Sequence, residues 1–366
     1  MLILKSTTTH NKNDFKPIFF NLQNESDELA LGKLIDSNPN IIICDELQSQ
    51  LKELIKIRNP QRKLTSVEEQ LELEKISLGS PWEKIGVWVF YPWNNKLIHL
   101  LSKDEFIELR TSRNLYKITP DERNVLLTKK IGIIGLSVGQ MIALTIAMER
   151  ICSEIRIADF DLIELSNMNR IRTSVSNLSI SKAVVAAREI AELDPYINVK
   201  VYIDGITESN IEDFLLSDAK LDLLIEECDG LDVKILSRVF ARKHGIPVVM
   251  ETNDRGMIDI ERFDLNKELP LLHGLIPDNM ENLAALKDLT NQEKVPLLGA
   301  MVGIDNISDR MKLSLSEMGK TISTWPQLAS SVVLGGAMVT DVSRRILLNQ
   351  LSISGRFYVD FDQLIK

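Results

Sequence analysis

The stretch KKIGIIGLSVGQMIALTIAM, residues 129–148, decides which fold this chain adopts. It admits three interpretations. The GLSVG segment matches the G-x-S-x-G elbow of serine hydrolases, with Ser137 as the nucleophile. The same residues match a shortened glycine turn between a strand and a helix, a structure that binds phosphate. Finally, the apolar run reaches the lower limit of membrane-spanning length.

Three glycines, Ser137 and Gln140 interrupt this run, so it resembles a buried parallel strand followed by a buried helix more than a membrane span. The 366 residues, 44% of them hydrophobic, allow one large domain and a smaller one. The net charge of -9 argues against general nucleic-acid binding, which requires a basic surface. The amino terminus has no cleavable signal pattern, which predicts a cytoplasmic protein that does not enter the membrane.

Regular alternation of strands and helices begins at residue 130. The expected strands are KIGII, EIRIAD, NVKVYID, LDLLIEEC and IPVVMET. The expected helices cover residues 140–149, 181–193, 209–217 and 232–244. This order predicts an α/β protein with a Rossmann-like, mostly parallel sheet and helices on both faces. RGMIDIERFDL adds an antiparallel edge strand, and QLASSVVLGGAMVTDVSRRILL a closing helix.

The chain divides into three parts on this pattern. Residues 1–118 form a smaller accessory α/β region of unassigned role, in which Ser66 is expected to cap the helix SVEEQLELEKI. Residues 119–350 form the main domain, and residues 351–366 a C-terminal strand and tail. Within the main domain, residues 265–325 have weak periodicity and are expected to form a crossover segment that grips the substrate. His273 and Trp325 are either contacts in that segment or packing residues.

Asp159 distinguishes a hydrolase from a nucleotide-binding fold. It lies at a strand end, one helix and one strand after Gly135. An acid at this distance from a glycine loop is the ribose-binding signature of nucleotide folds. A serine hydrolase needs a downstream acid and a histidine, which the chain contains, but its mechanism gives no reason for an acid at this position. Nucleotide binding is therefore the preferred interpretation.

The segments ADFDLIELSNMNRIRTSVSNLSISKA (158–183) and EECDG (226–230) carry a more specific pattern. Here the chain resembles the ThiF/MoeB/HesA family, the adenylating domains related to ubiquitin-activating enzymes. That family has a glycine loop, then D-x-D-x-[VI]-x-x-S-N-x-x-R, then a lysine, then an aspartate that ends a later strand. The matching residues, in order, are Asp159, Asp161, Ser166, Asn167, Arg170, Lys182 and Asp229.

The resemblance implies ATP and Mg²⁺ as ligands and gives these residues roles that agree with their chemistry. Arg170 and Lys182 would supply positive charge where a carboxylate attacks the α-phosphate. Asp229 would hold the magnesium ion. Asp159 would bind the ribose, and Asn167 a phosphate or the ribose. The remaining nucleotide contacts are expected from Gly135, Ser137, Gly139, Asp161 and Ser166. Individually, several of these residues could also be ordinary caps, turn residues or surface charges.

Two departures from the family pattern concern the phosphates. The usual G-x-G-G-x-G is GLSVGQ here, so either Ser137 replaces a glycine in a turn that is one residue shorter, or Val138 and Gln140 replace glycines in register. The phosphate-contacting arginine that relatives supply from a partner subunit has no certain match. Arg113 is the first choice for this catalytic position and Arg123 the second.

The positions of the cysteines indicate which group receives the acyl group after adenylation. Many relatives pass the acyl group to a catalytic cysteine, but no cysteine follows Cys228, which is expected to pack inside a buried strand. We therefore expect adenylation without an enzyme thioester. By resemblance, the substrate is the C-terminus of a ubiquitin-like protein, a peptide or a small-molecule carboxylate, and the enzyme is a homodimer. The alternatives are an NAD-binding oxidoreductase and a catalytically inactive scaffold subunit.

Overall fold

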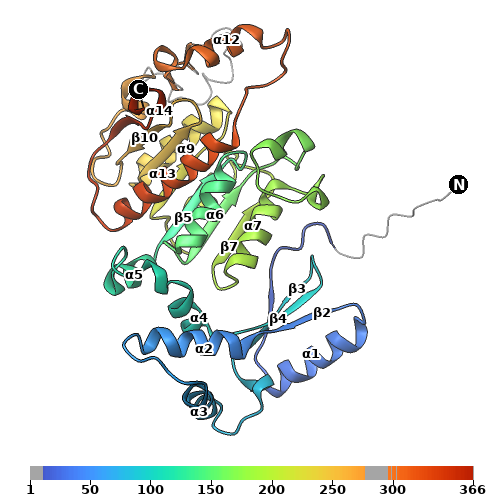
Figure 1. Ribbon diagram of the computed structural model, residues 1–366. Helices are drawn as coiled ribbons and strands as arrows, with labels where there is room; N and C mark the ends of the chain where they lie inside the picture. Colours follow the sequence, from blue (N-terminus) through green and yellow to red (C-terminus); the bar gives the residue numbers. More distant parts are fainter. Residues whose placement is uncertain (1–10, 277–295, 298, 302, 366) are drawn as a thin grey trace, which may run out of the picture. The chain divides into compact units, whose positions relative to one another are not determined.

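The computed structural model describes residues 11–276, 296–297, 299–301 and 303–365, and the chain separates into two compact units, Met1–Pro120 and Asp121–Lys366. Each unit has its own sheet (Figure 1). No helix among the residues described is long and apolar enough to cross a bilayer.

The first unit contains a four-stranded sheet in the order β1-β3-β4-β2. β3 and β4 form an antiparallel hairpin around the turn at Asn94 and Asn95, and β2 pairs with β4 in parallel. The strands are β1 (Ile18–Phe20), β2 (Ile42–Asp45), β3 (Val87–Tyr91) and β4 (Lys96–Leu100). The helices are α1 (Glu25–Ser37), α2 (Leu47–Arg58), α3 (Ser66–Ser77), η1 (Trp82–Lys84), α4 (Lys103–Arg110) and η2 (Ser112–Asn114).

The second unit is built on a seven-stranded sheet in the order β11-β10-β9-β8-β5-β6-β7. β5 to β9 are parallel, and β10 and β11 are antiparallel. The strands are β5 (Lys130–Ile134), β6 (Glu154–Ala158), β7 (Asn198–Tyr202), β8 (Leu223–Glu226), β9 (Val248–Thr252), β10 (Met257–Glu261) and β11 (Gly355–Tyr358). This arrangement confirms the predicted Rossmann-like α/β class.

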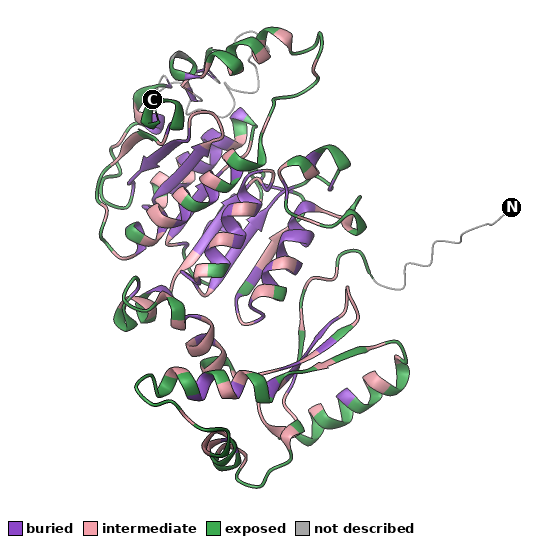
Figure 2. Ribbon diagram, in the orientation of Figure 1, coloured by how far each residue is buried: buried purple, intermediate pink, exposed green. Residues whose placement is uncertain are grey.

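Helices cover both faces of this sheet, and their inward sides are buried together with nearly the whole of the parallel strands (Figure 2). α6 packs against both α7 and α13 on one face, whereas α8 and α9 pack together on the other. The helices are α5 (Pro120–Leu126), α6 (Gly139–Glu149), α7 (Lys182–Leu193), α8 (Ile211–Leu216), α9 (Leu231–His244), α12 (Asp309–Glu317), α13 (Ala329–Leu347) and α14 (Phe361–Leu364). Short 3₁₀ turns are η3 (Leu165–Asn169), η4 (Val175–Asn177), η5 (Leu271–Gly274) and η7 (Ile304–Asn306).

Two local expectations were wrong. The cap of α3 is Thr65 and not Ser66, because Thr65 and Glu68 bond reciprocally to each other's backbone amides in a capping box. β10 is not the edge strand, because β11 pairs along its outer side. Parts of the crossover segment 265–325 lie outside the described residues, but η7 and α12 show that its second half contains helices.

Candidate functional site

The order of the strands creates a natural binding position beside β5. β6 and β7 lie on one side of β5, and β8 and β9 on the other. Loops that leave the carboxyl ends of two such strands in opposite directions open a crevice, where α/β proteins bind their ligands. Here the glycine loop follows β5, and the segment from Glu227 to Asp229 follows β8. The glycine loop and the segment that ends at Asp229 therefore lie at the same edge of the sheet.

Gly135 brings these two loops into contact. Its φ is +87°, and a Cβ atom at this position would lie 2.7 Å from the backbone nitrogen of Cys228 and 2.8 Å from the carbonyl oxygen of Glu227. Only glycine fits both the backbone angle and the space. Gly139 starts α6 for a similar reason, because a Cβ atom there would lie 2.9 Å from Ile133 Cγ2.

Asp159, just after β6, is buried and holds the glycine loop. One carboxylate oxygen accepts the Leu136 N–H at 2.6 Å, and the other accepts the Asp161 N–H at 2.8 Å. Burial raises the pKa of Asp159, while the charge of Lys182 and the two backbone amides oppose this rise. Asp159 therefore fixes the conformation of the glycine loop. The lone pairs that it does not use there could accept hydrogen bonds from a ribose.

Arg170 connects the loop after β6 with the glycine loop. Its Nε donates to Ser137 Oγ at 3.0 Å, and its Nη1 donates to Asn169 Oδ1 at 2.9 Å. Burial lowers the pKa of the Arg170 guanidinium, and the Asp229 carboxylate acts in the opposite direction. This contact also weakens the hydrolase interpretation, because an arginine bonded to Ser137 cannot serve as a general base.

Lys182 starts α7 and is buried, yet it reaches the same region. Its Nζ lies 2.7 Å from Asp161 Oδ2, and its backbone N–H donates to the Asp161 carbonyl at 2.9 Å. A cation at a helix N-terminus is electrostatically unfavourable without an anion beside it. Asp161 provides that anion here.

Asn167 and Ser166 occupy different environments in η3. The Asn167 Oδ1 accepts the Glu164 N–H at 3.1 Å, so its amide NH₂ is the group that can face a ligand. Ser166 is exposed. The same turn reaches the residues between the crossover segment and α13, because Asn169 Nδ2 donates to the carbonyl of Gln327 at 2.7 Å.

An open cleft adjoins this site. Val138 of the glycine loop and exposed Asp229 lie at its border, and β9 lies along it. Other lining residues include Met250, Met301, Ile307, Met311, Trp325 and Pro326. Trp325 therefore lies where a substrate contact was expected. His273 instead bonds to Asp259 of β10 at 3.0 Å and is not among the lining residues.

The two arginine candidates differ in position. Arg113 lies in η2 of the first unit. Arg123 lies in α5, which precedes the start of β5, whereas the glycine loop follows the end of that strand. A five-residue strand separates these ends by about 17 Å. Arg123 therefore lies at the opposite edge of the sheet from the glycine loop of its own chain.

Cys228 lies just beyond β8, not inside the strand as expected. It packs against the core of the second unit and borders the cleft, with its Sγ 3.6 Å from the Gly230 carbonyl oxygen. Burial raises the pKa of the Cys228 thiol well above its usual value, and Glu226 adds to the rise. A thiol held in this protonated form is a poor nucleophile.

Sequence reasoning missed Glu227 and Glu251, which both line the cleft. The Glu227 Oε1 accepts the backbone N–H of Glu251 at 3.0 Å. Burial raises the pKa of both carboxyls, to about 8 for Glu251. The available signal was a glutamate at the end of each of two otherwise apolar strands, LLIEE and VVMET.

These features define a Rossmann-like α/β unit whose glycine loop lies beside basic and acidic side chains. The chain belongs to the ThiF family, whose model matches residues 110–319. It is 40% identical over 278 residues to the uncharacterized protein MT1398 of Mycobacterium tuberculosis, an alignment that covers 76% of this chain and 38% of the relative. It is 29% identical over 99 residues to the tRNA threonylcarbamoyladenosine dehydratase 2 of Saccharomyces cerevisiae, covering 27% of this chain and 22% of the relative.

The chain thus spans well under half the length of both relatives. Among solved structures, the E. coli tRNA N6-threonylcarbamoyladenosine dehydratase TcdA is similar with a TM-score of 0.47 and 16% identity, over 66% of this chain and 95% of that one.

Proposed function

We propose that this chain catalyses the ATP-dependent adenylation of a substrate carboxylate and releases pyrophosphate. One observation carries the proposal: Arg170 donates to Ser137 of the glycine loop at 3.0 Å, close enough to Asp229 for that carboxylate to affect its pKa. A guanidinium, a phosphate-binding turn and a hard oxygen ligand thereby meet at one edge of the sheet. Membership of the ThiF family supports the same chemistry.

In the proposed step, a substrate carboxylate oxygen bonds to the α-phosphorus as the bond to the bridging oxygen breaks, and pyrophosphate leaves with the electron pair. Negative charge grows on the phosphate oxygens, so donors fixed in advance lower the barrier. Arg170 is held by Ser137 and Asn169 before ATP arrives. Lys182 would exchange its bond to Asp161 for one to a phosphate.

The residues present fit a magnesium ion. Asp229 is exposed and borders the cleft, and Mg²⁺ is typically held by one or two carboxylates together with substrate phosphates. Asp229 would hold the ion, which would supply charge neutralisation for the phosphates.

The finer parts of the proposal concern substrate, acceptor and assembly. The apolar cleft that includes Trp325 supports a peptide or protein C-terminus, or a small carboxylate, as the substrate. The raised pKa of Cys228 supports transfer without an enzyme thioester. We also propose a homodimer in which Arg113 or Arg123 serves the partner's phosphates, by resemblance to the family.

ATP–pyrophosphate exchange tests this function, with peptides bearing free C-termini and small carboxylates as candidate substrates. We expect exchange to fall at least about 100-fold in Lys182→Ala and in Asp229→Ala, since each removes a charge that acts on the transition state. Lys243→Ala, an exposed lysine of α9, is the matched control. Absence of ATP binding by calorimetry would instead indicate an inactive scaffold, and tight NAD binding an oxidoreductase.

A further inference from the structure

The cleft beside Asp229 combines an acidic floor with apolar walls. Glu227 and Glu251 border it, together with Asn253 and Asp254 at the end of β9. Its walls come from the crossover segment, including Met301, Ile307 and Trp325. Asp254 anchors this segment, because its carboxylate accepts both the N–H and the hydroxyl of Ser308 at 2.7 Å. The walls and the floor are therefore held against each other.

The floor contains hydrogen-bond acceptors that lack donors. Glu251 is only 4% exposed, yet neither of its carboxylate oxygens has a hydrogen-bond partner, and the Asn253 Oδ1 is also buried without one. Gly335 of α13 makes room for the carboxylate, because a side chain at that position would collide with it. Buried polar atoms without partners cost free energy and are rare in folded proteins, so a ligand that satisfies them is a reasonable explanation.

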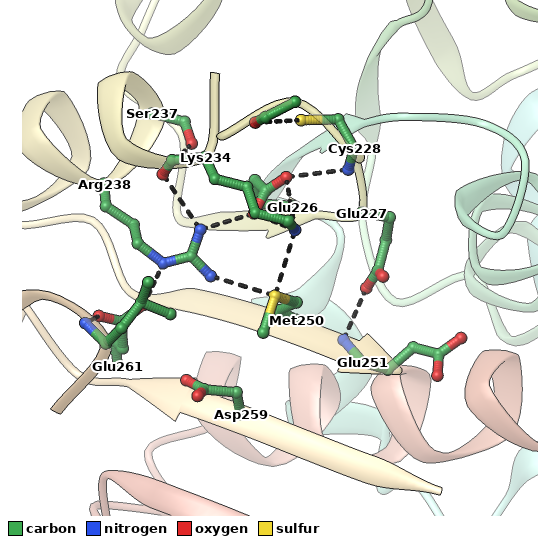
Figure 3. Close-up of polar contacts among 12 residues, drawn as sticks. Glu226, Glu227, Cys228, Lys234, Ser237, Arg238, Met250, Glu251, Asp259 and Glu261 are labelled. Atoms are coloured by element: carbon green, nitrogen blue, oxygen red, sulfur yellow. Dashed lines mark hydrogen bonds and ion pairs between the residues drawn. The ribbon is translucent and has the colours of Figure 1, made fainter. Parts of the chain in front are cut away.

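Lys234, the cation among the described residues that line the cleft, is already engaged elsewhere. Its Nζ lies 3.0 Å from Glu226 Oε2 and 3.3 Å from Met250 Sδ. Arg238 also binds Glu226 and bonds to Glu261 at 2.6 Å. The Glu251 carboxylate points away from this group (Figure 3). The chain thus provides no donor to Glu251 among the residues described.

A ligand that satisfies these acceptors would carry N–H donors and positive charge. A metal ion held at Glu251 by protein side chains alone is a poor match, because no group of three or more His, Cys, Asp or Glu in the described part of the chain is arranged to hold one. The magnesium ion proposed at Asp229 would depend on the phosphates of ATP for its other ligands. A primary ammonium offers three donors in a compact cation, and its alkyl chain suits the methionine, isoleucine and tryptophan walls. We propose that the cleft is a binding site for a primary alkylammonium group, held by Glu251 with Glu227 beside it.

Direct binding to the full chain tests this inference without any variant. The probe is n-pentylammonium chloride at pH 9, where the Glu251 carboxyl is ionised. Its affinity is measured by calorimetry against 1-pentanol and hexanoate, which have the same pentyl chain. We expect the ammonium to bind at least tenfold more tightly than either. Equal affinity for the alcohol, or no measurable binding of the amine, would overturn the proposal.

Two variants locate the site. Glu251→Gln keeps the size of the side chain and should weaken amine binding at least tenfold while ATP binding stays unchanged; Glu212→Gln, which removes an exposed carboxylate of α8, should change neither. Trp325 is the one tryptophan after residue 93, so Trp325→Phe should abolish an amine-induced change in tryptophan fluorescence. An undiminished affinity in Glu251→Gln, or a fluorescence change that persists in Trp325→Phe, would place the amine elsewhere. Because ATP binding is followed separately, failure here is distinguishable from failure of the adenylation proposal.

Discussion

The Nε of Arg170 donates to the Oγ of Ser137 at 3.0 Å, so the serine of the GLSVG loop positions the arginine of the S-N-x-x-R motif. This contact joins the loops that follow β5 and β6. It also gives Ser137 a role that needs no nucleophilic chemistry.

We expect Ser137→Ala to weaken ATP binding about tenfold, since a hydrogen bond to a charged group contributes roughly 1.5–3 kcal/mol. Calorimetric titration with ATP measures the effect. Ser176→Ala removes an exposed hydroxyl from the same region and should leave the affinity unchanged. Unchanged ATP affinity in Ser137→Ala would show that Arg170 is positioned without the serine.

Gly135→Ala should lower the free energy of unfolding by about 1–3 kcal/mol or more, because the φ of +87° and the 2.7 Å approach to Cys228 N both exclude a side chain. Urea unfolding followed by circular dichroism measures it. Gly32→Ala is the contrasting control, since Gly32 lies inside α1 with no atom within 4 Å of an added Cβ. A Gly135→Ala protein as stable as wild type would contradict the close contact between the two loops.

Arg238→Ala should destabilise the second unit by about 3–5 kcal/mol, because it removes the ion pair of the buried Glu261 and leaves the buried Glu226 with Lys234 alone. Lys243 lies in the same helix as Arg238 and forms an exposed ion pair with Glu212 of α8. Lys243→Ala should lower the free energy of unfolding by less than about 1 kcal/mol. Equal effects of the two substitutions in urea unfolding would refute the importance of burial here.

Glu251 makes stability depend on pH. Burial raises its pKa in the folded state to about 8, above the value of about 4.3 in an unfolded chain. The neutral carboxyl therefore contributes to the free energy of unfolding. This contribution is fully present below about pH 4.3 and is lost as the pH rises through about 8. Glu227 is the titratable group beside it, and α13 presents Gly335. We expect Glu251→Gln to raise the melting temperature more at pH 9 than at pH 5.5; a pH-independent effect would argue against a neutral carboxyl.

Cys228 should react slowly with iodoacetamide at pH 8, at least about tenfold more slowly than glutathione, because burial keeps its thiol protonated. Peptide mass spectrometry of the alkylated protein measures the rate. A hydroxylamine-labile adduct on Cys228 during turnover would contradict both this prediction and the absence of a thioester intermediate.

The sequence predicted the parallel sheet well, because strands buried on both faces are short continuous apolar runs with clear breaks between them. It predicted the residues around the glycine loop because their spacing follows from that fold. It could not predict that Arg170 reaches Ser137 or that Lys182 pairs with Asp161, since such contacts depend on how two loops lie together. Glu251 was missed because a single acid at the end of an apolar strand resembles an ordinary solvent-exposed strand end.

The last strand has a practical consequence for anyone who shortens this polypeptide. Arg356 of β11 bonds to Asp259 at 2.5 Å and to the carbonyl of Ala300 at 2.7 Å, so the final strand secures both its neighbour and the crossover segment. Trimming the chain after α13 would uncover the flank of β10 and leave a buried aspartate without its arginine. Recombinant versions of the protein should therefore retain β11 and carry any C-terminal affinity tag beyond it on a flexible linker.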